Sequence, residues 1–353
     1  MKNTTKIQWK LTVKSRTFNQ AGYIADTMEG FAMQRTDFPF VCTIIDDDSK
    51  DGEQTVIREY LEKNFDFSEN SVSYEEETEY ANIVFAQHRT NRNCYFAVLL
   101  LKENHYSQDK DIMPYLSEWR DGVTYYAFCE GDGYWIDPHK LQKQVDFLDT
   151  HPDYGMTYTD FNMLCQKSGV LKKSLFTTQP EIFPPKYSSA GDFIYSAGYV
   201  CPPSWVWRSD LPEVCDIESS DGTFVLFTHF LCVTKCHVLM DVTTTYRYLE
   251  ESASHSSNYE KMYERNKDIL QTQLTLIESY GLPEELKRKC QVSYYTSHLK
   301  EFVINDKQED IAEAARVLEN PSRKIRKTFA YNNPVGRFYL RCRKRWKDYR
   351  HSM

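Results

Sequence analysis

Near-continuous apolar runs separated by amphipathic segments constrain the fold of this chain most strongly. Such runs are typical of strands covered on both faces of a sheet, and they occupy residues 38–45, 94–101 and 123–129. Residues 7–13 alternate as a half-buried strand does, and apolar residues recur at helical spacing around Met28, Ile57 and Val145. Strands that alternate with helices predict an α/β fold, with a doubly wound, mostly parallel sheet flanked by helices.

The last hundred residues have a different character. Apolar residues recur at helical spacing from about 258 to 318, which predicts a helical extension over 256–353. From Asn320 onward, eleven Lys or Arg against one Asp give a net charge of +10, so the remainder carries −18. The sequence therefore predicts an acidic body that ends in a basic tail.

Several classes of protein are disfavoured by composition. With 41% apolar and 27% charged residues, the chain has enough apolar surface for a globular core. The longest uninterrupted apolar run, Tyr95–Leu101, is shorter than the roughly 20 residues of a membrane span. No apolar segment of a signal peptide follows residues 1–5, and ten cysteines show no repeating spacing. We expect a cytoplasmic protein with reduced thiols.

Acidic clusters follow two of the apolar runs directly. Asp46-Asp47-Asp48 follows Ile45, and Glu130-Gly131-Asp132 follows Cys129. The carboxyl ends of strands border the ligand crevice of an open α/β sheet, so both clusters should face it. Because the chain has neither G-x-G-x-x-G after its first strand nor a P-loop, a bound diphosphate needs a divalent cation. We expect Asp132 to bind Mg²⁺ or Mn²⁺. We expect Asp47, or else Asp46, to accept hydrogen bonds from a base or a ribose.

Other interpretations of these clusters remain open. Either cluster can be an ordinary turn, since Asp and Gly are common turn residues. A calcium loop beginning at Asp47 is disfavoured because Arg58 stands where a bidentate Glu is required. A zinc site at Cys232, Cys236 and His237 lacks a second clear pair of ligands, which favours an ordinary buried element.

Three stretches together resemble the family-2 glycosyltransferases of the GT-A fold, as found in bacterial surface-polysaccharide pathways. They are Thr17-Phe18-Asn19-Gln20 with Tyr23-Ile24-Ala25, Ile45 to Gly52, and Cys129 to Leu141. The resemblance extends over about residues 7 to 250. It implies a GT-A domain at 1–255, with a nucleotide-sugar-binding half at 1–160 and an acceptor-side half at 161–255.

The resemblance also implies site residues. Arg16, Thr17 and Asn19 would border the nucleotide, Asp47 would bind the base, and Asp132 would hold the metal against the diphosphate. Glu130 would lie near the ribose or metal, while Arg247 and His255 belong to a stretch that closes over the diphosphate, with His255 as a further metal ligand. In Ser219-Ser220-Asp221-Gly222, Asp221 would be the base for the acceptor hydroxyl.

The implied reaction is inverting transfer from a nucleotide sugar, expected to be UDP-linked, to a glycan or lipid-linked acceptor. Two departures stand against it: Gly133 occupies the place of a second Asp, and Ser220 replaces the Glu of a Glu-Asp pair. A catalytically weakened sugar- or nucleotide-binding module is therefore the alternative. A nucleic-acid partner is disfavoured because basic charge is confined to the tail.

Aromatic and basic residues leave two further questions open. Trp135 is the strongest of several aromatic residues that could stack on a sugar, although aromatic residues beside strands more often belong to the core. The basic tail, which includes Phe338, Tyr339 and Trp346, either lies on an anionic membrane surface or packs on the acidic body.

Overall fold

The computed structural model describes residues 7–250 and 256–351 of the chain, which form two compact units. Unit 1 contains the residues up to 188 together with 199–214 and 226–258. Unit 2 contains 189–198, 215–225 and the residues from 259 onward.

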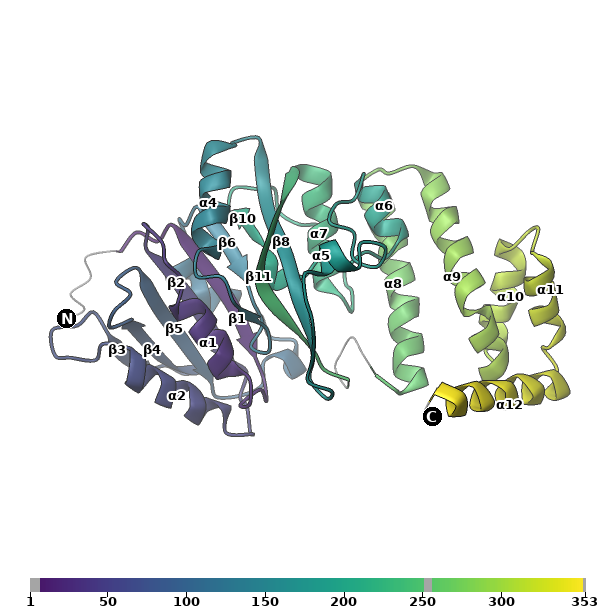
Figure 1. Ribbon diagram of the computed structural model, residues 1–353, viewed down its shortest axis with the longest axis horizontal. Helices are drawn as coiled ribbons and strands as arrows, with labels where there is room; N and C mark the ends of the chain where they lie inside the picture. Colours follow the sequence, from purple (N-terminus) through teal and green to yellow (C-terminus); the bar gives the residue numbers. More distant parts are fainter. Residues whose placement is uncertain (1–6, 251–255, 352–353) are drawn as a thin grey trace. The chain divides into compact units, whose positions relative to one another are not determined.

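In the described residues, unit 1 is built on a mixed sheet of 11 strands (Figure 1). The order along the sheet is β3-β4-β5-β2-β1-β6-β10-β8-β11-β7, and β9 pairs with β8. The strands are β1 (Leu11–Thr17), β2 (Phe40–Asp46), β3 (Tyr74–Glu77), β4 (Ala81–Gln87), β5 (Cys94–Leu101), β6 (Tyr125–Phe128), β7 (Tyr134–Trp135), β8 (Tyr154–Cys165), β9 (Val170–Lys172), β10 (Val206–Arg208) and β11 (Lys235–Tyr248).

The helices of unit 1 lie between these strands. They are α1 (Ile24–Ala32), α2 (Glu53–Asn64), α3 (Ser117–Arg120), α4 (Lys140–Thr150) and α5 (Leu175–Thr178), with 3₁₀ turns η1 (Tyr106–Gln108), η2 (Met113–Leu116) and η3 (Pro202–Ser204). Helix α7 (Gly222–Val233) begins in unit 2 and continues into unit 1. Unit 2 also contains α6 (Ala190–Tyr195), α8 (Tyr259–Ser279), α9 (Glu284–Asn305), α10 (Gln308–Val317), α11 (Arg323–Ala330) and α12 (Pro334–His351). Over the described residues, no helix has the length and apolarity needed to cross a bilayer.

The centre of the sheet is parallel. β1 pairs in parallel with β2 on one side and β6 on the other, and β5 continues the parallel set beyond β2. Strands β3, β4, β7, β9 and β10 join through antiparallel ladders. The doubly wound α/β prediction is confirmed for the centre, and the antiparallel strands add to it at both sides.

Two cores cover the faces of the parallel strands. Alternate residues of β2 supply both cores: Phe40, Cys42 and Ile44 face α1, α2 and α4, whereas Val41 and Ile45 face the layer that contains Trp119. Strand β2 is buried at every residue, which explains why its sequence is a continuous apolar run rather than an alternating one.

Unit 2 is helical in its described part. Tyr263 of α8 donates a hydrogen bond to Asp310 of α10 at 2.7 Å, and Phe302 of α9 packs edge-on against Tyr263. Leu299, Val303 and Ala314 are buried in the same unit. The helical spacing over 258–318 was therefore a sound predictor of α8, α9 and α10.

A close contact between α1 and β7 yields a stability test. A Cβ added at Gly30 would lie 2.8 Å from the backbone nitrogen of Trp135, whereas one at Gly22 would meet nothing within 4 Å. In an unobstructed helix, Gly→Ala stabilises by about 1 kcal/mol. We predict that Gly30→Ala instead lowers stability by about 1–3 kcal/mol, because two backbones must separate. Thermal unfolding with Gly22→Ala as control measures this, and a raised midpoint for Gly30→Ala would contradict it.

Candidate functional site

The loops after β1, β2 and β6 meet at one edge of the sheet. The backbone N–H of Asp47 donates to the carbonyl of Thr17 at 3.0 Å, and that of Gly131 donates to the carbonyl of Arg16 at 2.9 Å. Both acidic loops are thus bonded to the end of β1, the strand where the sheet order reverses. In open α/β sheets, this is where ligands bind. We call the ends of these three loops the carboxyl edge.

The buried carboxylate of Glu53 joins the first two loops. It accepts hydrogen bonds from the hydroxyl of Thr17, the backbone N–H of Gln20 at 2.9 Å and the hydroxyl of Ser49 at 2.8 Å. Burial raises the pKa of Glu53, while the hydrogen bonds from Thr17, Gln20 and Ser49 oppose the rise. The network fixes how the β1–α1 loop faces the β2–α2 loop.

Gly131 lets the third loop approach β1. A Cβ at this position would lie 2.2 Å from the Thr17 hydroxyl oxygen and 2.5 Å from the side-chain oxygen of Gln20. The hydroxyl of Thr27 contacts the carbonyls of Gly131 and Gly133 at 2.9 and 2.6 Å. The glycine between Glu130 and Asp132 is therefore required by space.

Asp132 lies half-buried in this loop. Burial raises the pKa of its carboxyl group, and the Arg247 guanidinium together with backbone N–H groups of its own loop opposes the rise. Arg247 donates to the Asp132 carbonyl at 2.9 Å, to Gln166 at 2.9 Å and to Asp26 at 2.8 Å. Arg247 is 5% exposed, so its position is set by these partners.

The chemistry of this loop fits a divalent cation that takes part of its ligands from a substrate. The described residues contain no cluster of three or more His, Cys, Asp or Glu side chains with metal-binding geometry. Mg²⁺ commonly takes one or two carboxylates, several waters and substrate phosphate oxygens. Asp132 and the exposed Glu130 supply carboxylates of that kind from one loop. His255, the other expected metal ligand, lies outside the described residues.

Asp47 and Asp46 have different surroundings. The Asp47 carboxylate is partly exposed and accepts from the backbone N–H groups of His105 and Tyr106 at 2.7 and 3.0 Å. It thereby holds the loop after β5, and carboxylate oxygens have lone pairs for a further donor. Asp46 is fully buried, accepts from Ser49 and Gln54, and leaves Oδ2 without a hydrogen bond. Asp46 therefore braces the turn rather than facing a ligand.

The other residues expected at the donor site also divide into exposed and buried ones. Arg16 and Asn19 are exposed at the edge, whereas Thr17 is buried and bonded to Glu53. The structure corrects the expectation for Trp135, because its ring is 2% exposed, stacks edge-on with Phe31 and donates to the Pro203 carbonyl at 2.8 Å. A sugar cannot reach that ring, so Trp135 belongs to the core.

Asp221 lies in unit 2 at the start of α7. One carboxylate oxygen accepts from the Phe224 N–H at 3.0 Å and the Thr223 hydroxyl at 2.7 Å, and the other pairs with Arg265 at 2.7 Å. Asp221 thus caps the helix and pairs with α8. The backbone N–H and hydroxyl of Ser220 both donate to Asp268.

The departure at Gly133 has a packing explanation. A Cβ there would lie 3.3 Å from the Pro203 ring and 3.5 Å from the sulfur of Cys129. A second Asp would require Pro203 to move by a few tenths of an ångström. The neighbouring segment is thus adapted to glycine at this position.

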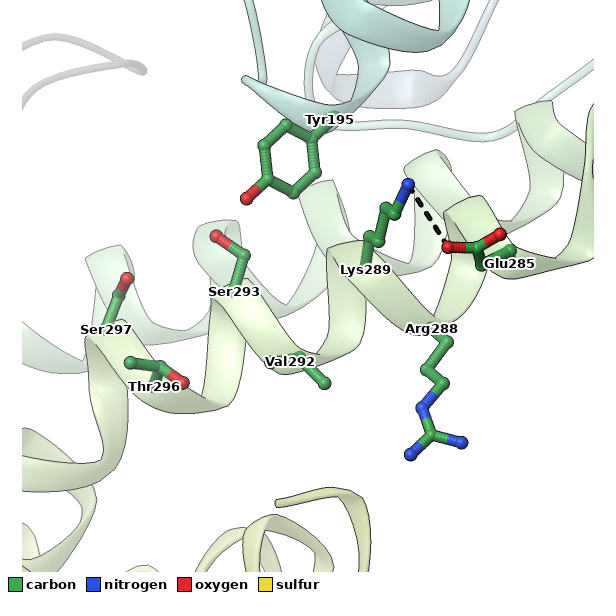
Figure 2. A pocket seen from close by; sticks show the side chains of 8 residues that line it. All are labelled: Tyr195, Glu285, Arg288, Lys289, Val292, Ser293, Thr296 and Ser297. Carbon is green, nitrogen blue, oxygen red and sulfur yellow. Dashed lines mark ion pairs between the residues drawn. The ribbon is translucent and has the colours of Figure 1, made fainter. Parts of the chain in front are cut away.

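Unit 2 has a separate hollow of about 450 Å³. Figure 2 shows Tyr195 above one face of α9, with the hydroxyls of Ser293 and Ser297 below it and the ion pair between Lys289 and Glu285 beside it. None of the expected donor-site residues lines this hollow.

Several residues that shape the edge were missed from sequence. Glu53 and Gln20 tie the loops together, and Tyr23 and Asp26 surround Arg247. The only signal for Glu53 was its place directly after Asp51-Gly52, which also suits an ordinary helix start. Partners so distant in sequence have no local signature.

Comparisons with known proteins bear on the fold. No family model matches the chain. The structure resembles Staphylococcus aureus TarS 1–349 in complex with UDP, with a TM-score of 0.51 and 18% identity over 98% of this chain and 92% of that one. The structure also resembles the complex of the same protein with UDP-GlcNAc, with a TM-score of 0.50 and 17% identity over 94% of this chain and 87% of that one. The chain therefore has the fold of the GT-A-type glycosyltransferases.

Sequence relatives add little about function. Uncharacterised proteins of Mycobacterium bovis and Mycobacterium tuberculosis are 34% identical over 145 residues, which is 40% of this chain. The match spans 32% of each relative's length.

The environment of Asp46 predicts a pH effect on stability. Burial raises its pKa above the ordinary value of 3.8, so the folded state retains the proton better than the unfolded chain does. Stability is therefore lost as pH rises from about 4 through the folded-state pKa. We predict that Asp46→Asn, which stays neutral, gains stability relative to the native chain between pH 4 and pH 7.

A matched control has the opposite sign. Hydrogen bonds from Ser68 lower the pKa of Asp66 below its ordinary value of 3.8, so Asp66→Asn should lose stability relative to the native chain as pH rises toward 3.8, and the difference should be nearly constant above about pH 5. Thermal midpoints at several pH values measure both differences. Parallel curves for the native chain and Asp46→Asn would contradict the prediction.

Proposed function

We propose that this chain transfers a sugar from a nucleotide-activated, UDP-linked donor to a glycan or lipid-linked acceptor, with inversion and with a divalent metal ion. The setting we propose is bacterial surface-polysaccharide assembly. The observation that carries the proposal is the convergence of three loops, bearing Thr17, Asp47 and Asp132, at the carboxyl edge. The GT-A-type fold supports it, since a structure of this fold was solved with UDP.

The roles proposed at the donor side follow from the contacts. Asp47, partly exposed and held by the His105 and Tyr106 N–H groups, accepts from a base N–H. Arg16 and Asn19 border the nucleotide at the exposed rim, and Arg247 positions the Asp132 loop through its carbonyl. Asp132, with Glu130 beside it, holds the cation. When bound, the cation offsets charge that develops on the departing diphosphate.

The acceptor side of the proposal rests on Asp221. Its carboxylate takes the proton from an acceptor hydroxyl as the oxygen forms a bond to the anomeric carbon and the nucleoside diphosphate leaves. Arg265 and the start of α7 hold that carboxylate in one orientation. His255 remains a proposed metal ligand on the resemblance alone.

Nucleotide binding tests the donor site first. In a thermal-shift panel of nucleoside diphosphates with and without Mn²⁺, we expect UDP with Mn²⁺ to raise the melting temperature most. Binding without turnover of any sugar nucleotide would favour the alternative, a binding module in which Gly133 and Ser220 mark lost chemistry. No shift with any nucleotide would contradict both the transferase and a nucleotide-binding module.

Removing the Asp132 carboxylate should remove metal-dependent chemistry. We predict that Asp132→Ala lowers nucleotide release from the sugar nucleotide by about 100-fold or more, because several kcal/mol of charge stabilisation is lost. Asp146→Asn, an exposed position on α4, is the control and should stay near the native rate. Full activity in Asp132→Ala would overturn the metal assignment.

Removing the proposed base should separate binding from transfer. We predict that Asp221→Asn lowers transfer to a pool of oligosaccharide acceptors by about 10²- to 10⁴-fold while UDP binding is unchanged. Asn keeps the helix cap, so the fold should be retained. Arg265→Gln is the matched control, because it breaks the same ion pair and keeps the carboxylate. Equal losses of transfer in both variants would indicate that transfer depends on the ion pair between Asp221 and Arg265 and not on Asp221 as a base.

A further inference from the structure

Helix α12 has two opposite faces with different environments. Leu340 is 4% exposed and packs into unit 2, where Arg337 pairs with Asp306 at 2.5 Å and Lys344 with Glu301 at 2.8 Å. Arg341 donates to the Ile304 carbonyl at 2.9 Å. One face of α12 is therefore fixed to the end of α9 by apolar packing, ion pairs and a hydrogen bond.

The opposite face is an exposed apolar stripe. The stripe consists of five exposed residues. Val335 is 79% exposed, Phe338 69%, Tyr339 47% and Trp346 60%, and Cys342 is also exposed. Their spacing of 3, 4, 7 and 11 from Val335 places them on one side of a helix. A row of large apolar side chains in water is unusual for a surface without an interaction partner. We call this set the α12 stripe.

Cations without acidic partners lie on the neighbouring helix. Arg323, Lys324, Arg326 and Lys327 of α11 are exposed, and none of them forms an ion pair within the described residues. Elsewhere in unit 2, exposed Arg288 pairs with Glu319 and exposed Lys289 with Glu285, whereas Lys267 and Lys300 are single exposed cations, so the four cations of α11 form a cluster. The stretch from Asn320 onward carries +10. Apolar rings and unneutralised cations thus occur together on α11 and α12.

We propose that α11 and α12 form a peripheral membrane-binding element for an anionic lipid surface. The α12 stripe enters the boundary between headgroups and acyl chains, and the α11 cations contact acidic headgroups. Charge complementarity favours a membrane as the occupant: a second copy joined through the same face would bring the +10 segment against itself, and phosphate-rich nucleic acid offers no apolar layer for Phe338 and Trp346. The proposal does not depend on the proposed function.

Vesicle sedimentation of the full chain tests the proposal. We expect binding to vesicles of equal parts phosphatidylglycerol and phosphatidylcholine, and little binding to phosphatidylcholine alone. A Lys or Arg near an anionic surface is worth about fivefold in partitioning, so the combined Lys324→Gln, Arg326→Gln and Lys327→Gln variant should bind about 100-fold more weakly. The combined Phe338→Ser and Trp346→Ser variant should lose about tenfold per ring.

Matched controls change the same side-chain types elsewhere. One control variant combines Lys172→Gln, Lys173→Gln and Lys186→Gln, and the other combines Val170→Ser and Ile182→Ser. All five positions are exposed in unit 1. These should bind within about twofold of the native chain, since they lie outside α11 and α12. Circular dichroism confirms that each variant folds.

Three outcomes would overturn the proposal. The first is equal binding to neutral and anionic vesicles, and the second is a loss in the controls as large as in the α11 and α12 variants. The third is self-association of the native chain that Phe338→Ser with Trp346→Ser abolishes, in the absence of vesicle binding. That last result would assign the α12 stripe to a second copy of the chain.

Discussion

The carboxyl edge depends on one buried carboxylate. Glu53 begins α2 with its side chain fully buried, and its oxygens accept from Thr17, Gln20 and Ser49. A buried carboxylate is costly unless it is hydrogen-bonded, and three donors from two loops offset that cost only in one arrangement of those loops. The position of Thr17 in turn sets the space that only glycine can fill at Gly131. The placement of Asp132 therefore depends on a buried residue of another loop.

Arg247 performs a similar role on the other side of Asp132. It comes from β11, yet its guanidinium contacts α1 through Asp26, the β6–β7 loop through the Asp132 carbonyl, and Gln166 after β8. The rings of Tyr23 and Tyr134 lie 4.6 and 5.0 Å from it. Its charge is nearly removed from water, so these contacts define its position closely. Distant segments of unit 1 are thus held around a single acidic loop.

The sequence was informative where a pattern is local. The apolar run at 94–101 coincides with β5, because a strand buried on both faces leaves a continuous signal. Asp47 and Asp132 were placed at the strand ends by position alone, and the structure puts both loops on the end of β1. Trp135 was ambiguous because burial depends on Phe31 and Pro203, which are far away in sequence. Glu53 was missed for the same reason, and strands β3, β7, β9 and β10, with two to four residues each, were too short to leave a pattern.

The central claim is that the loops of the carboxyl edge hold a nucleoside diphosphate. A crystal structure of the chain with UDP and Mn²⁺ tests it most directly. The account predicts electron density for the base beside Asp47 and for the metal ion beside Asp132. Density for the nucleotide elsewhere, such as in the hollow between Tyr195 and α9, with the edge unchanged, would contradict it.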